Sequence, residues 1–309
     1  MINAHTCQLA LNVRSISTSL KWYESLGFSF SGSYGPSTGD IVAATLERPS
    51  VTLNIAWLVG RDSLAQLELI EFVDPRPKPQ PEWSPNREGY GAISIVAFDF
   101  AGQLERFQRE GADPLLFGSA GDQSMWIKDP DGIWVEILES EPFPARIVAS
   151  GCERLSSIRA VTLTVRNLEK TKQFWVDTLG FEVADEIVRP FKPLPPALTG
   201  GASFGETILA SGPVLVRLLE PPSDAFMERP ADYKLGDELG AFNIALLIED
   251  KNRYLAYADQ LLEGGFRGAT PAPLALNDTG LWYGYDRQGT SLEICYVEPD
   301  MVEQCGWKR

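Results

Sequence analysis

The chain has 309 residues, 44% of them hydrophobic, which is enough for two domains with sizeable cores. A net charge of −15 and a pI near 4.6 argue against partners such as nucleic acid or anionic membranes, which need a basic surface. No apolar run approaches the ~20 residues of a membrane helix, and the start "MINAHTCQLALNV" lacks a signal-peptide pattern. The cysteines are scattered, with no CxxC pair, and indicate reduced thiols in a cytoplasmic protein.

The first predicted elements recur later in the chain. "LALNVRSISTSLKWYESLGFSF" (9–30) matches "VTLTVRNLEKTKQFWVDTLGFEV" (161–183), each with a strand, Val-Arg, an amphipathic helix and Leu-Gly-Phe. "GAISIVAFDFAGQLERFQREGA" (91–112) matches "AFNIALLIEDKNRYLAYADQLLEGGF" (241–266), where a strand leads into a helix that ends at glycine. The sequence therefore predicts four modules of strand, helix and strands.

Two of these modules end in an acidic turn and a strand with one carboxylate among apolar residues. The two segments are "DPDGIWVEILE" (129–139) and "DRQGTSLEICYVE" (286–298), which place Glu136 and Glu293 at equivalent positions. Strand alternation puts small and polar residues on one face of the first strands and Leu, Ile and Val on the other. A small, polar inner face predicts room for a ligand, and a solvated sheet face is the alternative.

Two modules are predicted to form each domain, in chain order. The first domain would span 1–140, with modules at about 4–73 and 90–140. The segment 141–157 would be a linker, 158–300 the second domain, and 301–309 a C-terminal tail.

The repeated strand–Val-Arg–helix–Leu-Gly-Phe openings, "LELIEF" (67–72) and "DPDGIWVEILE" resemble the vicinal oxygen chelate superfamily. That superfamily includes glyoxalase I, methylmalonyl-CoA epimerase, extradiol dioxygenases, and bleomycin- and fosfomycin-resistance proteins. The resemblance covers nearly the whole chain and implies an α+β fold, in which βαβββ modules pair into two half-open barrels. Family members often pair through their edges, which leaves a homodimer open.

The resemblance also implies metal-ligand positions on the first and last strand of each module. In the first domain they would be Gln8, Glu68, Ala92 and Glu136, so Gln8, Glu68 and Glu136 are candidate ligands of a divalent metal. An imidazole-free oxygen set suits a hard cation better than zinc. The single histidine, His5, lies three residues before Gln8 and is predicted to be a frayed terminal residue.

In the second domain the same positions would be Ala160, Arg217, Asn243 and Glu293. We expect the guanidinium of Arg217 to take the place of a metal and to form an ion pair with Glu293, as a structural bridge or as an anchor for an anionic ligand. Only Glu293 remains of the ligands that the resemblance implies for an iron dioxygenase, so ring cleavage with iron is disfavoured.

Without a metal, Glu68 and Glu136 are predicted to converge on one cavity, where one carboxyl acquires a raised pKa. The favoured function is metal-independent proton transfer of the isomerase or lyase type on an apolar or aromatic oxygenated compound, with no cofactor. The predicted catalytic residues are Glu68, Glu136, Glu293 and Arg217. The alternatives are a ligand-sequestering resistance protein, and a glyoxalase- or dioxygenase-like enzyme with a reduced metal-ligand set.

Aromatic and small polar residues are predicted to bind the small-molecule ligand. The predicted substrate-binding residues are Gln8, Asn12, Ala92, Trp134, Thr162, Asn243, Tyr283 and Phe191. Further aromatic residues near the predicted cavities are Trp57, Phe72, Trp126, Trp282 and Tyr285. An apolar or aromatic ligand suits such walls.

Overall fold

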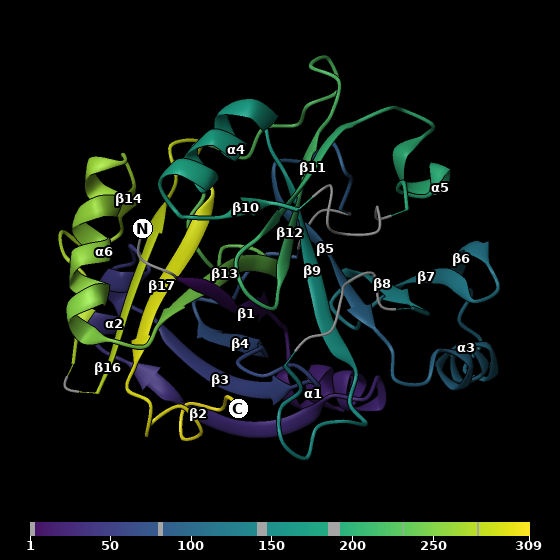
Figure 1. The fold of residues 1–309 in the computed structure, drawn as a ribbon, viewed down its shortest axis with the longest axis horizontal. Helices are drawn as coiled ribbons and strands as arrows, with labels where there is room; N and C mark the ends of the chain where they lie inside the picture. Colours follow the sequence, from purple (N-terminus) through teal and green to yellow (C-terminus); the bar gives the residue numbers. More distant parts are fainter. Residues whose placement is uncertain (1–3, 80–82, 141–146, 185–191, 231, 277) are drawn as a thin grey trace.

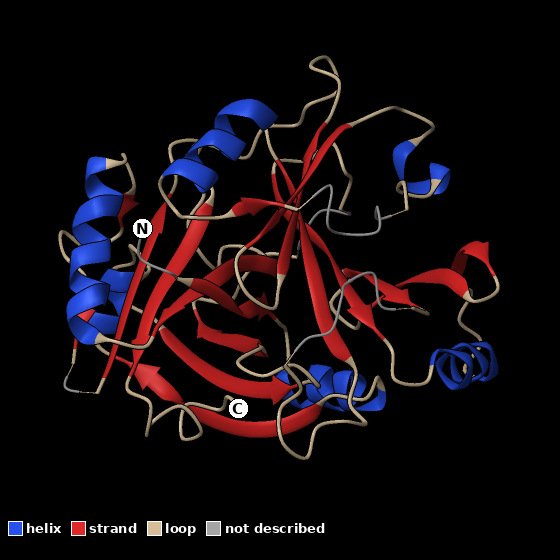
Figure 2. Ribbon diagram, in the orientation of Figure 1, coloured by secondary structure: helices blue, strands red, loops and turns tan. Residues whose placement is uncertain are grey.

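Two mixed sheets with helices against them make this an α+β fold, as the sequence predicts. Figure 2 shows the strands at the centre and the helices at the periphery. The computed structural model describes residues 4–79, 83–140, 147–184, 192–230, 232–276 and 278–309. Within these ranges, no helix has the length and apolar character needed to cross a membrane.

All four predicted modules are present. Module 1 comprises β1 (His5–Asn12), α1 (Ile16–Ser25), β2 (Ser29–Thr38), α2 (Asp40–Thr45), β3 (Thr52–Val59) and β4 (Gln66–Asp74). Module 2 comprises β5 (Gly89–Val96), α3 (Phe100–Arg109), β6 (Leu115–Ser119), β7 (Asp122–Lys128) and β8 (Trp134–Leu138). Module 3 comprises β9 (Ser157–Thr164), α4 (Leu168–Asp177), β10 (Glu182–Val183), α5 (Pro196–Thr199), β11 (Gly205–Ala210) and β12 (Leu215–Glu220). Module 4 comprises β13 (Gly240–Ile248), α6 (Lys251–Glu263), β14 (Arg267–Gly268), β15 (Leu274–Ala275), β16 (Thr279–Tyr285) and β17 (Ser291–Val297).

The modules do not combine in chain order. Because β1 pairs antiparallel with β13, modules 1 and 4 share a nine-stranded sheet, β14-β16-β17-β13-β1-β4-β3-β2, with β15 on β16. Because β5 pairs antiparallel with β9, modules 2 and 3 share an eight-stranded sheet, β10-β11-β12-β9-β5-β8-β7-β6. In Figure 1 the yellow β17 and the purple β1 accordingly belong to one sheet. Each sheet therefore takes one module from each predicted domain.

The two segments that connect the sheets contact each other through backbone bridges and an ion pair. β4 leads to β5 through residues 75–88, and β12 leads to β13 through residues 221–239. Bridges join Lys78 to Glu238 and Arg87 to Met227, and Arg87 Nη2 lies 2.8 Å from Glu238 Oε2. The crossing is thus fixed by backbone pairing and by an ion pair, which stabilises the exchange of modules between the sheets.

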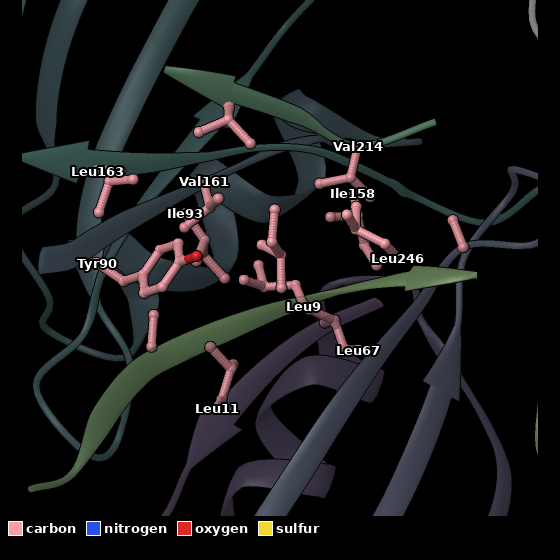
Figure 3. Packing of buried hydrophobic residues seen from close by; sticks show 14 of the residues in the cluster. Leu9, Leu11, Leu67, Tyr90, Ile93, Ile158, Val161, Leu163, Val214 and Leu246 are labelled. Atoms are coloured by element: carbon pink, nitrogen blue, oxygen red, sulfur yellow. The ribbon is translucent and has the colours of Figure 1, made fainter. Parts of the chain in front are cut away.

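One apolar core joins the outer faces of both sheets to the helices. It contains Leu9 of β1, Ile93 of β5 and Val161 of β9, together with Tyr23 of α1 and Trp175 of α4. Figure 3 shows residues of β1, β5 and β9 meeting in this core. The alternation predicted from the sequence is confirmed, because Leu, Ile and Val of these strands lie in this core and their polar neighbours face the other side.

The inner faces, opposite this core, are more filled than the sequence predicts. In the nine-stranded sheet, Phe72 and Tyr285 pack with Leu235 of the crossing segment. The C-terminal residues Val302 and Trp307 pack beside Ala245. Trp307 Nε1 also donates a hydrogen bond to Cys7 O at 3.2 Å. The small residues of the strands therefore accommodate side chains from other segments, which strand alternation alone does not show.

Candidate functional site

Two tight turns position the glutamate strands β8 and β17. Asp129 Oδ1 accepts hydrogen bonds from Asp131 N at 2.9 Å and Ile133 N at 2.8 Å, while Oδ2 accepts one from Tyr23 Oη at 3.0 Å. Asp286 is equivalent: Oδ2 accepts a hydrogen bond from Trp175 Nε1 at 2.9 Å, and Oδ1 accepts bonds from the backbone of its own turn. The first aspartate of each turn is therefore a structural anchor that connects a neighbouring module's helix to the glutamate strand.

Four polar side chains meet on the inner face of the nine-stranded sheet. They come from its adjacent strands β4, β1, β13 and β17 and are Glu68, Gln8, Asn243 and Glu293. The register places Ala10 between Glu68 and Asn243, and Ala245 between Gln8 and Glu293. All four are buried, with Glu68 5% and Glu293 7% exposed. The small alanines leave the space into which the longer side chains extend.

Aromatic donors hold both carboxyl groups of this cluster. Trp57 is the register partner of Glu68, and its Nε1 donates to Glu68 Oε1 at 3.1 Å. Tyr283 is the register partner of Glu293 and forms a side-chain hydrogen bond with it. Asn243 Nδ2 donates to Glu293 Oε2 at 3.4 Å. Since Trp57 and Tyr283 are only half-buried, they form the boundary between the carboxyl pair and solvent.

Burial raises the pKa of both carboxyl groups. The pKa of Glu68 rises to about 8 because of desolvation and repulsion by Glu293, although hydrogen bonds from Trp57 and Gln8 oppose the shift. Desolvation raises the pKa of Glu293 to about 7, against hydrogen bonds with Tyr283 and Asn243. Near neutral pH the pair therefore holds about one proton, since two buried carboxylates that repel each other are costly.

The inner face of the eight-stranded sheet has a different arrangement. Ser94 Oγ donates to Glu136 Oε2 at 2.6 Å. The guanidinium of Arg217 is fully buried, and its Nη2 lies 2.6 Å from Glu206 Oε2 and donates to Lys192 O at 3.0 Å. Desolvation raises the pKa of Glu136, and the positive charge of Arg217 opposes that shift. This site combines carboxylates with a fixed cation, whereas the nine-stranded site has two carboxyl groups that repel each other.

Two predicted pairings are therefore wrong. Glu68 and Glu136 do not share a cavity, because β4 and β8 belong to different sheets. Arg217 does not pair with Glu293, because β12 lies in the eight-stranded sheet, where Glu206 is its partner. Like-charged carboxyls do converge, but the partner of Glu68 is Glu293. Both errors follow from the exchange of modules between the sheets.

The remaining candidates have varied positions. Asn12 donates to Gly236 O at 3.2 Å and Glu238 O at 2.6 Å, so it fixes the crossing segment. Ala92 and Trp134 belong to an apolar cluster of the eight-stranded inner face, and Thr162 is buried beside Arg217 in the register. Trp282 lies in the shared core instead of on an inner face, and His5 begins β1 half-buried, so it is not frayed. Phe191 lies outside the described residues.

Glu206, the partner of Arg217, is not among the residues predicted from the sequence. Its signal is the alternation in "GETILA" (205–210), which places Glu206 and Ile208 on one face of β11. Ile208 is the register partner of Arg217, so Glu206 is its diagonal neighbour across the hairpin. The hairpin register would have been needed to recognise this ion pair.

Paired βαβββ modules with polar residues on the inner strand faces define the class of fold to which the chain belongs. The profile of the Glyoxalase/Bleomycin resistance protein/Dioxygenase superfamily matches residues 5–137 and 157–294, and the chain belongs to this family. A search among curated proteins found no match.

Solved structures of similar fold support this assignment. Glyoxalase I from Zea mays is 15% identical with a TM-score of 0.60, and the match covers 96% of this chain and 92% of that one. A putative dioxygenase from Bacillus subtilis is 14% identical with a TM-score of 0.63, and the match covers 99% of this chain and 90% of that one. Identities this low establish the fold and leave the reaction open.

The donor set of the nine-stranded site fits a hard divalent cation. Gln8, Glu68, Asn243 and Glu293 occupy the strand positions that the family resemblance implies for metal ligands, and all supply oxygen. Glu68 Oε2 and Asn243 Oδ1 are buried and accept no hydrogen bond within the described part of the chain. Among all the residues that the structure describes, no group of three or more His, Cys, Asp or Glu side chains could hold a metal, so a site here would also need the amide oxygens. A site of two carboxylates and two amides suits Mg²⁺, Ca²⁺ or Mn²⁺ better than zinc.

Proposed function

We propose that the chain is an enzyme that transfers protons on a small, partly apolar carbonyl compound, and that the nine-stranded site carries the reaction. The observation that supports this proposal is the buried pair Glu68 and Glu293, whose carboxyl groups share about one proton near neutral pH. A general acid and a general base are then present together.

The different pKa values suggest a role for each residue. Near pH 7.5, Glu293, with the lower pKa of about 7, is mostly ionised, and Glu68, with a pKa of about 8, is mostly protonated. Glu293 takes a proton from the carbon next to the carbonyl, and Glu68 donates its proton to the carbonyl oxygen, which gives an enol. When the substrate is an α-hydroxy carbonyl compound, this enol is an enediol: Glu293 then gives its proton to the former carbonyl carbon while the other hydroxyl returns a proton to Glu68, which completes an isomerisation and restores both carboxyl groups.

Neighbouring side chains position this pair. Trp57 Nε1 is bonded to Glu68 Oε1, which leaves Glu68 Oε2 for the substrate. Tyr283 and Asn243 orient Glu293 through hydrogen bonds. The half-buried rings of Trp57 and Tyr283 exclude water and suit a substrate with an apolar part.

Exchange of carbon-bound hydrogen in D₂O tests the proposal. A panel of small aldehydes and ketones with hydrogen next to the carbonyl is incubated with the protein and followed by proton NMR. Exchange catalysed by the wild type should fall roughly 10²- to 10⁴-fold in Glu68→Gln and Glu293→Gln. Glu71→Gln is the matched control, since Glu71 lies on the same strand but accepts a hydrogen bond from Ile16 N.

Two results would contradict the proposal. Exchange that is equal in wild type and both variants would exclude the carboxyl pair, and absence of exchange across the panel would exclude the reaction class. Saturable binding of a carbonyl compound without exchange would favour the ligand-sequestering alternative.

A metal-assisted reaction is a second candidate, favoured by the free oxygens Glu68 Oε2 and Asn243 Oδ1. Gln8, Glu68, Asn243 and Glu293 would hold the cation. A bound divalent cation supplies Lewis-acid polarisation of a substrate oxygen. Elemental analysis of protein purified without added metal, with Glu68→Gln as comparison, tests this candidate: metal retained by the wild type alone supports it.

A further inference from the structure

The C-terminal residues 301–309 lie on the inner face of the nine-stranded sheet, beside its carboxyl pair. Val302 and Trp307 pack with Cys7 of β1 and Cys295 of β17, and Trp307 is only 5% exposed. Trp307 Nε1 also donates a hydrogen bond to Cys7 O at 3.2 Å. In Figure 1 the C-terminus accordingly lies beside β3 and β2, which form the edge of this sheet. These residues are therefore part of the surroundings of the candidate site.

Two hydrogen bonds fix the C-terminal residues relative to β4. Gln66, two residues before Glu68 on this strand, donates from Nε2 to Cys305 O at 3.3 Å. Leu64 N donates to Lys308 O at 2.8 Å. Gln66 is fully buried, so its bond is shielded from competing water. The C-terminal residues therefore keep a set position relative to the strand that carries Glu68.

One residue of this segment, Gly306, lies against the indole ring of Trp57. A Cβ atom at position 306 would be 3.0 Å from both Cβ and Cε3 of Trp57, which is closer than an ordinary van der Waals contact. The backbone at Gly306 has a φ of +86°, a conformation that glycine adopts without strain. Both the space and the backbone conformation therefore require glycine at this position.

A second glycine meets the same edge of the indole. Gly32 of β2 is the register partner of Trp57, and a Cβ atom there would be 3.3 Å from Trp57 Cε3. In the eight-stranded sheet, the register partner of Trp126 on the edge strand β6 is Leu115. Trp126 Nε1 has no hydrogen-bond partner among the described residues, whereas Trp57 Nε1 is bonded to Glu68. The indole that holds its glutamate is thus the one that lies against glycines.

These contacts select one orientation of the Trp57 ring. Cε3 and Nε1 are on opposite edges of an indole, and a half-turn about χ2 would exchange them. With Cε3 against the two glycines, Nε1 is directed to Glu68 Oε1, at 3.1 Å. Because the indole N–H is the ring's single hydrogen-bonding group, the half-turn would remove this bond from Glu68.

We infer that Gly306 and Gly32 are positioning residues of the nine-stranded site. They hold Trp57 in the orientation that fixes Glu68 Oε1 and leaves Glu68 Oε2 for a substrate. The orientation of Trp57 follows from these contacts alone, whereas its consequence for catalysis rests on the proposed proton transfer. The two parts are therefore tested by separate measurements.

The indole N–H signal of Trp57 in ¹H–¹⁵N NMR spectra tests the orientation. Trp57→Phe assigns this signal by its loss. Gly306→Ala and Gly32→Ala should each displace the ring, so the signal should move upfield, toward that of an indole without a hydrogen bond. Its proton should exchange with D₂O roughly tenfold faster, as loss of one hydrogen bond implies.

Gly121→Ala is the matched control for Gly306→Ala. Gly121 has a φ of +85°, but no described atom lies within 4 Å of the place that its Cβ would take. The two substitutions therefore introduce similar backbone strain, and only Gly306→Ala presses on Trp57. The Trp57 signal should stay in place in Gly121→Ala. If Gly306→Ala does not fold, Gly32→Ala remains informative, because Gly32 lies outside the left-handed region.

The D₂O exchange assay tests the consequence for catalysis. In both Gly306→Ala and Gly32→Ala, kcat should fall roughly three- to tenfold, and by a larger factor than any rise in KM, because the lost bond orients the acid. Gly121→Ala should keep the kcat of the wild type. Circular dichroism verifies that each variant is folded.

An unchanged Trp57 signal in both folded variants, Gly306→Ala and Gly32→Ala, overturns the inference. A signal that moves while kcat stays constant also overturns the positioning role. A signal that moves in both variants, when the wild type itself has no exchange activity, supports the orientation inferred for Trp57 and contradicts only the proposed reaction.

Discussion

Both inner faces contain a buried glutamate whose register partner is an aromatic residue, but the charges around the glutamate differ. In the nine-stranded sheet Glu68 and Glu293 repel each other, and their pKa values rise to about 8 and about 7. In the eight-stranded sheet Arg217 stands near Glu136 and is paired with Glu206. A carboxyl pair without a cation is suited to hold and move a proton, whereas a carboxylate beside a fixed cation is suited to bind. The two inner faces therefore differ in the charge that surrounds their buried glutamates.

The largest expected effect is on stability, from removal of the cation. Arg217→Met should destabilise the protein by about 3–5 kcal/mol, because it leaves Glu136 and Glu206 without their neutralising charge. Urea denaturation measures the change, and Arg217→Met combined with Glu136→Gln should recover part of it. A single variant as stable as the wild type would contradict the electrostatic difference between the sheets.

The pH dependence of stability should come largely from three buried carboxyl groups with raised pKa values: Glu68 and Glu293 of the nine-stranded site, and Asp129, whose pKa burial raises to about 7. The folded-state pKa values of Glu68 and Glu293 lie above the ordinary 4.5, so the folded protein binds protons more tightly than the unfolded chain. Their contribution is complete below about pH 4.5 and is lost as pH rises through 7 and 8. The free energy of unfolding should fall by a few kcal/mol, in order of magnitude, between pH 5 and 9.

Glu68→Gln should flatten this profile and be more stable than the wild type at pH 9, since it removes a buried charge. Thermal unfolding of wild type, Glu68→Gln and the control Glu71→Gln over this pH range provides the measurement. A steep profile that persists in Glu68→Gln would show that other groups control it.

We expect a divalent cation to bind at the nine-stranded site, with an affinity that depends on pH. Mn²⁺ competes with protons for Glu68 and Glu293, so calorimetry should show binding roughly tenfold or more weaker at pH 6.5 than at pH 8.5. Glu68→Gln should abolish the binding, and Glu71→Gln should keep it. Binding that is independent of pH would place the cation elsewhere.

The smallest expected effects concern two hydroxyl groups of the eight-stranded sheet. Ser94→Ala removes the donor to Glu136 Oε2 and should cost about 1–2 kcal/mol. Thr162→Val removes a buried hydroxyl without a partner among the described residues, and should change stability by less than about 0.5 kcal/mol or raise it. Equal losses in both variants, measured by urea denaturation, would mean that Thr162 is bonded after all.

Much of the fold could be predicted from the sequence because it depends on local patterns. The repeats at 9–30 and 161–183 predict equivalent modules, and alternation in β1 assigns Leu9 to the core and Gln8 to the inner face. The acidic turns likewise predict the strands that carry Glu136 and Glu293. These features follow from the chain's own periodicity and turn chemistry, so the sequence by itself determined them.

Only the tertiary structure decided which glutamates meet. The four modules present similar strand edges, and nothing local distinguishes pairing of β1 with β5 from pairing of β1 with β13. Interactions far apart in the chain, including Arg87 with Glu238 across the crossing segments, accompany the pairing that forms. The residues of the candidate sites were thus readable from the sequence, but their partners, and with them the charge of each site, depend on long-range sheet assembly.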